Sequence, residues 1–296
     1  MTDPDLHARR GLIAGVAAYL VWGFLPLLFH ALRDVPPLEL VAWRVVFTLP
    51  VCAVFVVASR GGPDLWMTLR RPALLGRLTF SAMLIAINWS VYVMAVVRGH
   101  VLATSLGYYI NPLLNVLTGT LFLGERLRWR QWAAVAVAAV GIALLIAGAL
   151  DMIGIALLLA TSFGVYGLVR KLTPVRAITG MMIETMALFP FAAIWLSIVR
   201  HGPALSALAH PMPTPLLVAS TGLATAVPLI LFAVAARNMR LSALGFLQFA
   251  LPTMVFLVGV FVLGEPLDPM RLRCFVFIWG AVGLFIWDAW VKRPAS

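Results

Sequence analysis

Ten apolar stretches of about 20 residues follow one another along this chain, with only short connections between them. Each stretch is long enough to cross the roughly 30 Å hydrocarbon core of a membrane as a helix. Only 11% of the residues are charged, against about 25% in a typical soluble domain. A soluble core does not account for that deficit. We therefore predict membrane spans at 11–31, 36–58, 73–97, 101–123, 130–148, 152–169, 176–199, 214–236, 241–263 and 271–290.

The spans are predicted to be helices and not the strands of a barrel. Strands of a membrane barrel alternate apolar and polar side chains. The stretch "WAAVAVAAVGIALLIAGAL" at 132–150 shows no such alternation. The first apolar run ends in "FHALRD" without a small-residue cleavage site, so we interpret it as a span and not as a signal peptide. Cys52 and Cys274 lie in or beside spans and form no disulfide framework.

The distribution of basic residues predicts the orientation. Cytoplasmic loops of membrane proteins are enriched in Lys and Arg. If the loops alternate between two sides, the side that carries both termini holds sixteen of the 22 basic residues. The other side holds five, and Arg44 lies inside a span. We therefore expect both termini in the cytoplasm, and the net charge of +11 needs no nucleic-acid partner.

Two similar stretches predict an internal duplication. "INPLLNVLTGTLFLGE" at 110–125 and "ALPTMVFLVGVFVLGE" at 250–265 share a proline at the third position and a final Leu-Gly-Glu, at an offset of 140 residues. The chain is thus predicted to contain two five-helix repeats, 1–149 and 150–296. Because five is odd, the second repeat enters the membrane from the opposite face. Inverted repeats are typical of secondary transporters, whose substrates bind near the midplane between the repeats.

Several stretches resemble the EamA-type branch of the drug/metabolite transporter superfamily, and its RarD group in particular. They include "AYLVWGFLPL" at 18–27, "ATSLGYYINPLLNVLTGTLFLGERL" at 103–127, "FGVYGLVRK" at 163–171, "TGMMIETMALFP" at 179–190 and "LSALGFLQFALPT" at 241–253. The resemblance covers nearly the whole chain. It implies a bacterial inner-membrane exporter or facilitator of small metabolites. Related branches move amino acids, and some members are linked to drug resistance.

Ionisable groups inside spans cost about 2.5 to 3.5 kcal/mol on insertion scales and are functional candidates. Arg44 and Glu184 are two such groups, and the repeat offset of 140 residues relates them. Two interpretations are open: they form a fixed ion pair between the halves, or each meets one end of a zwitterionic substrate. Glu39, nearer the end of its span, is interpreted as an interface residue.

Amides and aromatic rings inside the spans are the other candidates. Amides between membrane helices either hydrogen-bond to each other or contact a substrate. Pro112 removes a backbone donor and frees a carbonyl near Tyr108, and Pro252 does the same in the second half. Aromatic side chains either pack or line a cavity suited to a small amphiphile. The residues expected to bind substrate are Trp22, Arg44, Asn88, Trp89, Tyr108, Asn111, Tyr166, Glu184 and Gln248.

Several function classes lack a sequence signal. There is no phosphate-binding loop for ATP, no metal-ligand cluster and no catalytic triad, so we expect no cofactor and no enzymatic activity. The expected function is secondary transport of small organic metabolites, amino acids or similar amphiphiles first, by alternating access. The alternatives are a membrane-embedded lipid-modifying enzyme, a drug-efflux carrier without amino-acid activity, and a channel-like or structural bundle. The expected partners are the small-molecule substrate and the lipid bilayer, and the oligomeric state is left open, with a monomer as one candidate.

Overall fold

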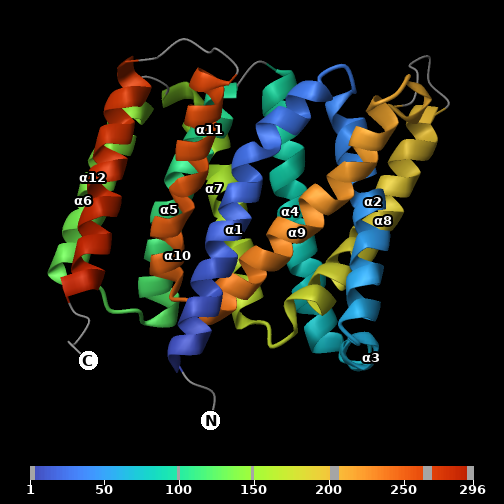
Figure 1. Cartoon of the computed structure of the whole chain (residues 1–296), viewed down its shortest axis with the longest axis horizontal. Coiled ribbons are helices and arrows are strands. Elements are labelled where there is room, and N and C mark those ends of the chain that lie inside the picture. Colours follow the sequence, from blue (N-terminus) through green and yellow to red (C-terminus); the bar gives the residue numbers. More distant parts are fainter. Residues whose placement is uncertain (1–3, 99–100, 148–149, 201–206, 263–268, 292–296) are drawn as a thin grey trace.

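The chain folds into a bundle of long helices. The computed structural model describes residues 4–98, 101–147, 150–200, 207–262 and 269–291, and the regular structure in these ranges is all helical (Figure 1). Two short 3₁₀ turns accompany twelve α-helices. The helices are α1 (Pro4–Ala31), α2 (Pro37–Ala58), α3 (Gly62–Leu69), α4 (Pro72–Val97), α5 (Val101–Leu123), α6 (Trp129–Ala147), α7 (Ile153–Leu172), α8 (Ala177–Arg200), α9 (Thr214–Asn238), α10 (Leu241–Gln248), α11 (Ala250–Phe261) and α12 (Pro269–Val291).

The helices match the predicted spans with one refinement. Nine of the ten predicted spans correspond to single helices. The span predicted at 241–263 is instead divided into α10 and α11 at Phe249. Eight segments of the described residues are long and apolar enough to cross a membrane, with α10 and the start of α11 counted as one. The helices α5 and α12 are not among these eight. The protein is therefore a multi-pass helical membrane protein, and the count of ten spans stays a prediction.

The outer surface of the bundle is apolar, as a lipid-facing surface must be. Phe122, Phe191 and Phe261 are each about 70% exposed or more, on three different helices. In water, an apolar surface spread over so many helices would drive association. In a bilayer it contacts acyl chains, and the intrahelical hydrogen bonds satisfy the backbone.

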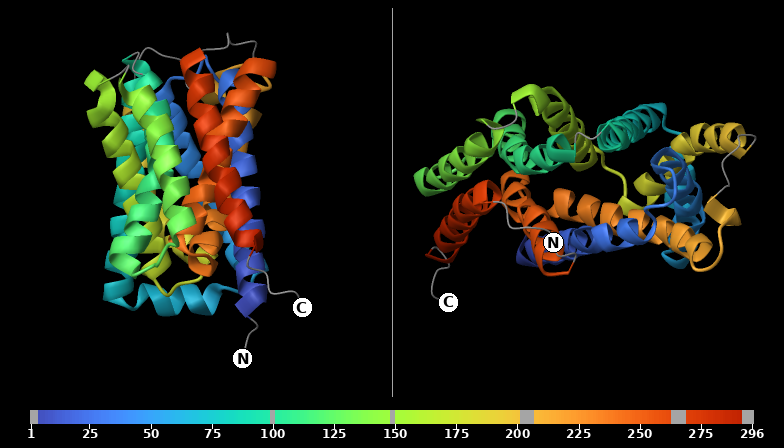
Figure 2. Two further views of the ribbon diagram at one scale, coloured as in Figure 1. Left: turned by 90° about the vertical axis from the view of Figure 1, so that its left-hand side faces the viewer. Right: turned by 90° about the horizontal axis from the view of Figure 1, so that it is seen from above.

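The long helices form two layers. Figure 2, seen from above, shows α6, α5, α7 and α4 in one row and α12, α11, α1 and α9 in the other. The pair α6 and α12 forms one end of the elongated bundle, and the pair α2 and α8 lies toward the other. Both termini lie at the same end of the helices, which we call the terminal end (Figure 1).

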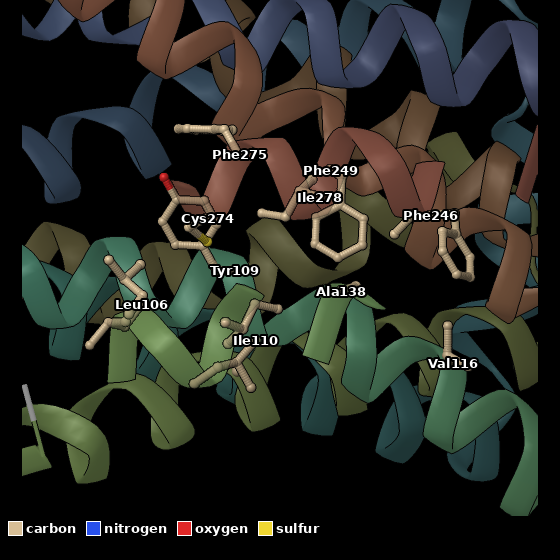
Figure 3. Packing of buried hydrophobic residues seen from close by; sticks show 14 of the residues in the cluster. Leu106, Tyr109, Ile110, Val116, Ala138, Phe246, Phe249, Cys274, Phe275 and Ile278 are labelled. Atoms are coloured by element: carbon tan, nitrogen blue, oxygen red, sulfur yellow. The ribbon is translucent and has the colours of Figure 1, made fainter. Parts of the chain in front are cut away.

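Interlocking aromatic rings hold the layers together between α5 and the α10–α12 segment (Figure 3). Tyr109 packs edge-on against Phe275, with ring centroids 5.6 Å apart. Phe246 stacks on Phe285 at 4.0 Å. Aromatic pairs of this kind contribute about 0.5–1.5 kcal/mol each beyond area burial.

A glycine sets the distance between α2 and α9. A Cβ added at Gly222 would lie 2.4 Å from the backbone carbonyl carbon and oxygen of Phe47. The Thr48 hydroxyl also donates to the Gly222 carbonyl at 3.3 Å. Small residues allow membrane helices to approach this closely, and here the approach brings Thr225 of α9 beside Arg44 of α2.

Candidate functional site

A cavity of about 680 Å³ lies between the two layers. Its wall comes from α1, α2, α4, α5, α7, α9, α10 and α11. The residues that line it are Trp22, Leu25, Pro26, Phe29, His30, Arg44, Ile85, Asn88, Trp89, Tyr92, Thr104, Ser105, Tyr108, Tyr109, Phe163, Thr225, Leu229, Gln248, Leu251, Pro252, Val255, Phe256 and Val260. These positions run from the middle of the helices toward the end away from the termini (Figure 1). The volume is ample for an amino acid or a metabolite of similar size.

Six of the nine residues predicted to bind substrate line this cavity: Trp22, Arg44, Asn88, Trp89, Tyr108 and Gln248. They come from five separate helices, α1, α2, α4, α5 and α10. Whether they bind a substrate stays a prediction, but the fold brings them to one hollow.

The Arg44 guanidinium is held by a hydrogen bond and by two aromatic rings. Its Nε donates to Thr225 Oγ1 at 3.1 Å, and its guanidinium carbon lies 4.7 Å from the ring centroid of Trp89. Phe29 lies on another side, with its ring centroid at 5.4 Å. Cation–π contacts stabilise a desolvated guanidinium by about 2 kcal/mol or more. The aromatic residues thus hold the charge in place at the cavity wall.

The aromatic part of the wall is a connected cluster. The Trp22 ring lies 5.9 Å from Phe163 and 5.8 Å from Phe232, which links α1 to α7 and α9. Tyr92 and Tyr108 approach each other at 6.2 Å across α4 and α5. These contacts fix the rings, so they present rigid apolar faces to the cavity.

The amides are largely engaged in packing. The Asn88 amide nitrogen donates to the Leu159 carbonyl at 2.8 Å and to Ser162 Oγ at 3.0 Å. Asn115 donates to Gln248 Oε1 at 2.6 Å. Such bonds hold helices together and leave the carbonyl oxygen of Asn88 and the amide nitrogen of Gln248 as the groups available to an occupant.

Two prolines place backbone carbonyls at the cavity. Pro112 cannot donate to the carbonyl four residues earlier, which belongs to Tyr108, and Pro252 likewise leaves the carbonyl of Gln248 without its usual donor. Both carbonyl-bearing residues line the cavity. That the prolines expose polar backbone to the cavity stays a prediction.

Three predicted site residues lie outside the cavity wall: Asn111, Tyr166 and Glu184. Asn111 is 3% exposed, and its Oδ1 has no hydrogen-bond partner among the described residues. It lies on the side of α5 that faces α7, where its Oδ1 would be 3.7 Å from a Cβ added at Gly164. Helical periodicity alone did not distinguish this face from the one that carries Tyr108.

The suggested pairing of Arg44 with Glu184 is wrong. Glu184 instead pairs with Arg170 of α7, Nη1 to Oε1 at 3.3 Å. It also accepts hydrogen bonds from Ser81 Oγ and from the Tyr166 hydroxyl, the latter at 3.5 Å. The predicted span 152–169 ended just before Arg170, yet Arg170 lies within α7 and is 3% exposed. Because Arg170 stands next to Lys171 at the end of an apolar span, the sequence did not indicate that it pairs with Glu184.

The group around Glu184 lies just beyond the cavity wall. A void of about 10 Å³, near the size of one water molecule, is bordered by Thr48, Glu184 and Thr185. It shares Ile85, Trp89 and Leu229 with the large cavity. These three side chains therefore border both the cavity and the void beside the buried carboxylate.

Buried and partly buried hydrogen bonds connect the helices at the terminal end of the bundle. Glu125, from the first Leu-Gly-Glu motif, accepts from the Leu241 and Ser242 backbone nitrogens at 2.6 and 2.9 Å, and so caps α10. Lys171 donates to the carbonyls of Ala236, at 2.9 Å, and Met239. The second Leu-Gly-Glu, 263–265, lies outside the described residues. The described residues contain no group of His, Cys, Asp and Glu that could hold a metal ion.

Comparison with known proteins identifies the class. Residues 9–147 match the model of the EamA-like transporter family. An uncharacterized transporter of Pseudomonas aeruginosa is 43% identical over 96% of this chain and 95% of its own length. The protein therefore belongs to the EamA-like transporters of the drug/metabolite transporter superfamily, in the RarD-like group.

The RarD relatives are similar over their whole length. Protein RarD of Escherichia coli K12 is 40% identical over 98% of both chains. A second Pseudomonas aeruginosa protein, named chloramphenicol-sensitive protein RarD, is 31% identical over 95% of this chain and 94% of its own length. One crystal structure matches with a TM-score of 0.75 and 21% identity, and covers 96% of this chain and 99% of its own, so its fold is similar.

Proposed function

We propose that this protein is a secondary transporter that carries small organic metabolites across the bacterial inner membrane by alternating access. Amino acids or similar amphiphiles are the first candidates. One observation carries the proposal: the cavity extends toward one end of the bundle, while buried polar contacts around Glu184 and Glu125 fill the other. A carrier that is open to one side at a time needs this asymmetry.

The packing of the helices supports two related halves, 1–149 and 150–296, with ten spans. In the proposed repeat, α1, α2, α4, α5 and α6 correspond to α7, α8, α9, α10–α11 and α12. The contacts of α1 recur at its counterpart α7. α1 packs on α9, and α7 packs on α4, which is the counterpart of α9. In the same way, α1 packs on α11 and α7 packs on α5. Two further pairs, α2 with α8 and α6 with α12, join counterparts. Halves of opposite orientation support the rocking motion of alternating access.

The basic residues at the terminal end support a cytoplasmic location for both termini. In that orientation, the cavity lies in the outer half of the membrane. We propose that a monomer is sufficient for transport.

The name of the chloramphenicol-sensitive relative favours a second candidate, a drug carrier without amino-acid activity. The cavity's aromatic wall also suits a neutral aromatic drug. A membrane-embedded lipid-modifying enzyme is the third. The experiment must therefore include amino acids, chloramphenicol and a lipid analysis.

The test is counterflow in liposomes that contain the purified protein. The vesicles are preloaded with one unlabelled compound, and uptake of the labelled compound is followed for a panel of amino acids and for chloramphenicol. The Trp22→Ala variant, which removes a ring from the cavity wall, is compared with Trp132→Ala, whose ring is exposed on α6. We expect saturable counterflow that Trp22→Ala reduces and Trp132→Ala leaves unchanged.

The outcomes separate the candidates. Counterflow of chloramphenicol alone would establish the drug carrier and remove the amino-acid assignment. No counterflow of any compound, with altered lipid composition in a deletion strain, would favour the enzyme. Flux that does not saturate would indicate a channel.

A further inference from the structure

The charge of the cavity wall is one-sided. Among the described lining residues, Arg44 is the one that carries a permanent charge, and His30 is the one other ionisable base. No aspartate or glutamate belongs to this wall. The two carboxylates that sequence analysis singled out within the spans lie elsewhere: Glu184 pairs with Arg170, and Glu39 accepts from Trp43 and from the Ala207 backbone.

Arg44 has no counter-ion in the part of the chain that the structure describes. No carboxylate oxygen there lies within 4.0 Å of its guanidinium nitrogens. Among the described residues, the Arg44 side chain makes one hydrogen bond, from Nε to Thr225, and its two terminal nitrogens carry four further N–H donors. A guanidinium fork of this kind matches a planar carboxylate with two parallel hydrogen bonds.

The contrast with Arg170 shows that the lack of a partner is specific to the cavity. Arg170 is 3% exposed, and the chain supplies it with Glu184 and the Ala177 carbonyl. A charge inside the membrane is expensive unless an opposite charge or a watery cavity accompanies it. Since the described residues place no carboxylate at Arg44, an occupant of the cavity is one source of an opposite charge.

The rest of the wall suits an apolar body and not an ammonium group. Trp22, Phe163 and Leu229 present apolar surface. An amino group bound near Arg44 would meet a like charge, and only neutral oxygens, such as those of Asn88 and the Tyr108 carbonyl, could compensate it. The cavity therefore recognises one end of a zwitterion and lacks a charged partner for the other.

We propose that the substrate of this transporter is an organic anion, a carboxylate joined to an apolar or aromatic body, whose carboxylate binds the Arg44 guanidinium. The α-amino group of an amino acid is not required. This inference rests on the proposed transport function and names its substrate class.

The test uses ligands that share an indole ring and differ in charge: tryptophan, indole-3-propionate and tryptamine. Binding is measured on the purified full-length protein in detergent, and counterflow is measured separately in liposomes. We expect tryptophan and indole-3-propionate to bind, and tryptamine, which lacks a carboxylate, to bind about 10- to 100-fold more weakly, the usual range for loss of a charge-assisted hydrogen-bonded pair.

Three variants locate the effect. Arg44→Gln is expected to weaken binding of both carboxylates by a similar factor and to leave tryptamine unaffected or improved. Arg44→Lys keeps the charge without the fork and should recover part of the affinity. Arg98→Gln removes an exposed arginine at the same end of the bundle and should change nothing. The comparison of the three ligands is made on the wild-type protein. It therefore tests the proposal even if Arg44→Gln does not fold.

The two readouts distinguish this inference from the transport function. Counterflow of tryptamine as fast as that of indole-3-propionate would confirm a carrier and overturn the anion assignment. Binding of the anions that depends on Arg44, without flux, would support the anion site and contradict the transporter. Equal affinity of Arg44→Gln and the wild type for indole-3-propionate would overturn the role of Arg44.

Discussion

The guanidinium of Arg170 and the carboxylate of Glu184 form an ion pair of 3.3 Å with both side chains only 2% exposed. The pair joins α7 to α8, and Ser81 of α4 adds a third helix through its hydrogen bond to Glu184. Arg170 also packs against Gly180, where a Cβ would lie 1.9 Å from its Nη1. The pair therefore stabilises the terminal end of the bundle, below the cavity.

Replacement of Glu184 by Gln should destabilise the protein strongly. The change removes the counter-ion and leaves the Arg170 charge buried, which costs about 3–5 kcal/mol for a pair of this kind. Thermal unfolding in detergent measures the effect, and Arg71→Gln, at an exposed arginine near the same end, serves as the control. The double variant Arg170→Met with Glu184→Met should recover part of the loss. Equal stability of Glu184→Gln and the control would contradict a structural role for the pair.

A methyl group at Gly222 should separate α2 from α9. The added Cβ would lie 2.4 Å from the Phe47 backbone, which cannot move aside as a flexible side chain can. Gly222→Ala should therefore cost about 1–3 kcal/mol through overpacking, and it should reduce transport because Thr225 and Arg44 are drawn apart. Gly76→Ala is the matched control, since nothing lies within 4 Å of its added Cβ. The idea fails if both alanine variants unfold at the same temperature.

Loss of the Glu125 carboxylate should loosen the start of α10. This carboxylate accepts two backbone N–H groups and the Ser242 hydroxyl, at 2.6 Å, where the helix carries orphan donors. Glu125→Ala should cost about 1–2 kcal/mol, in the range of other helix caps, and Ser242→Ala a smaller part of that. Hydrogen exchange of α10 amides should rise in Glu125→Ala. Unchanged exchange there would show that the cap is dispensable.

The proposal of ten spans makes a direct prediction for α5 and α12, the helices outside the set of eight. Single cysteines at Arg98 and Arg126 flank α5, and cysteines at Met270 and Val291 flank α12; all four positions are exposed. If both helices cross the bilayer, each pair should label from opposite sides with an impermeant thiol reagent. Cys52 and Cys274 are buried and should contribute little background. Labelling of either pair from one side would reduce the number of spans.

The hydropathy pattern was sufficient to predict the positions of the long helices. Nine expected spans correspond to single helices, eight of them within about three residues, because apolar length along a helix is a local property of the chain. The exception is α1, which begins at Pro4 and not at residue 11. The break at Phe249 was not expected as a division of the span, although the prediction that Pro252 disturbs the backbone lay three residues away. A proline in the sequence indicates that one backbone hydrogen bond is lost. The position at which the helix ends and the next begins depends on the packing around α10 and α11.

The sequence by itself determined the class of this protein: a helical membrane protein of the EamA-like transporters, with Trp22, Arg44 and Gln248 among its candidate site residues. Only the tertiary structure decided that Glu184 pairs with Arg170 and not with Arg44, and that Asn111 lies away from the cavity while Tyr108 lines it. The physical reason is that apolar length and residue type are properties of one helix. The partner of a buried charge depends on how each helix is rotated and which neighbours it packs against, and these follow from the contacts of the whole bundle.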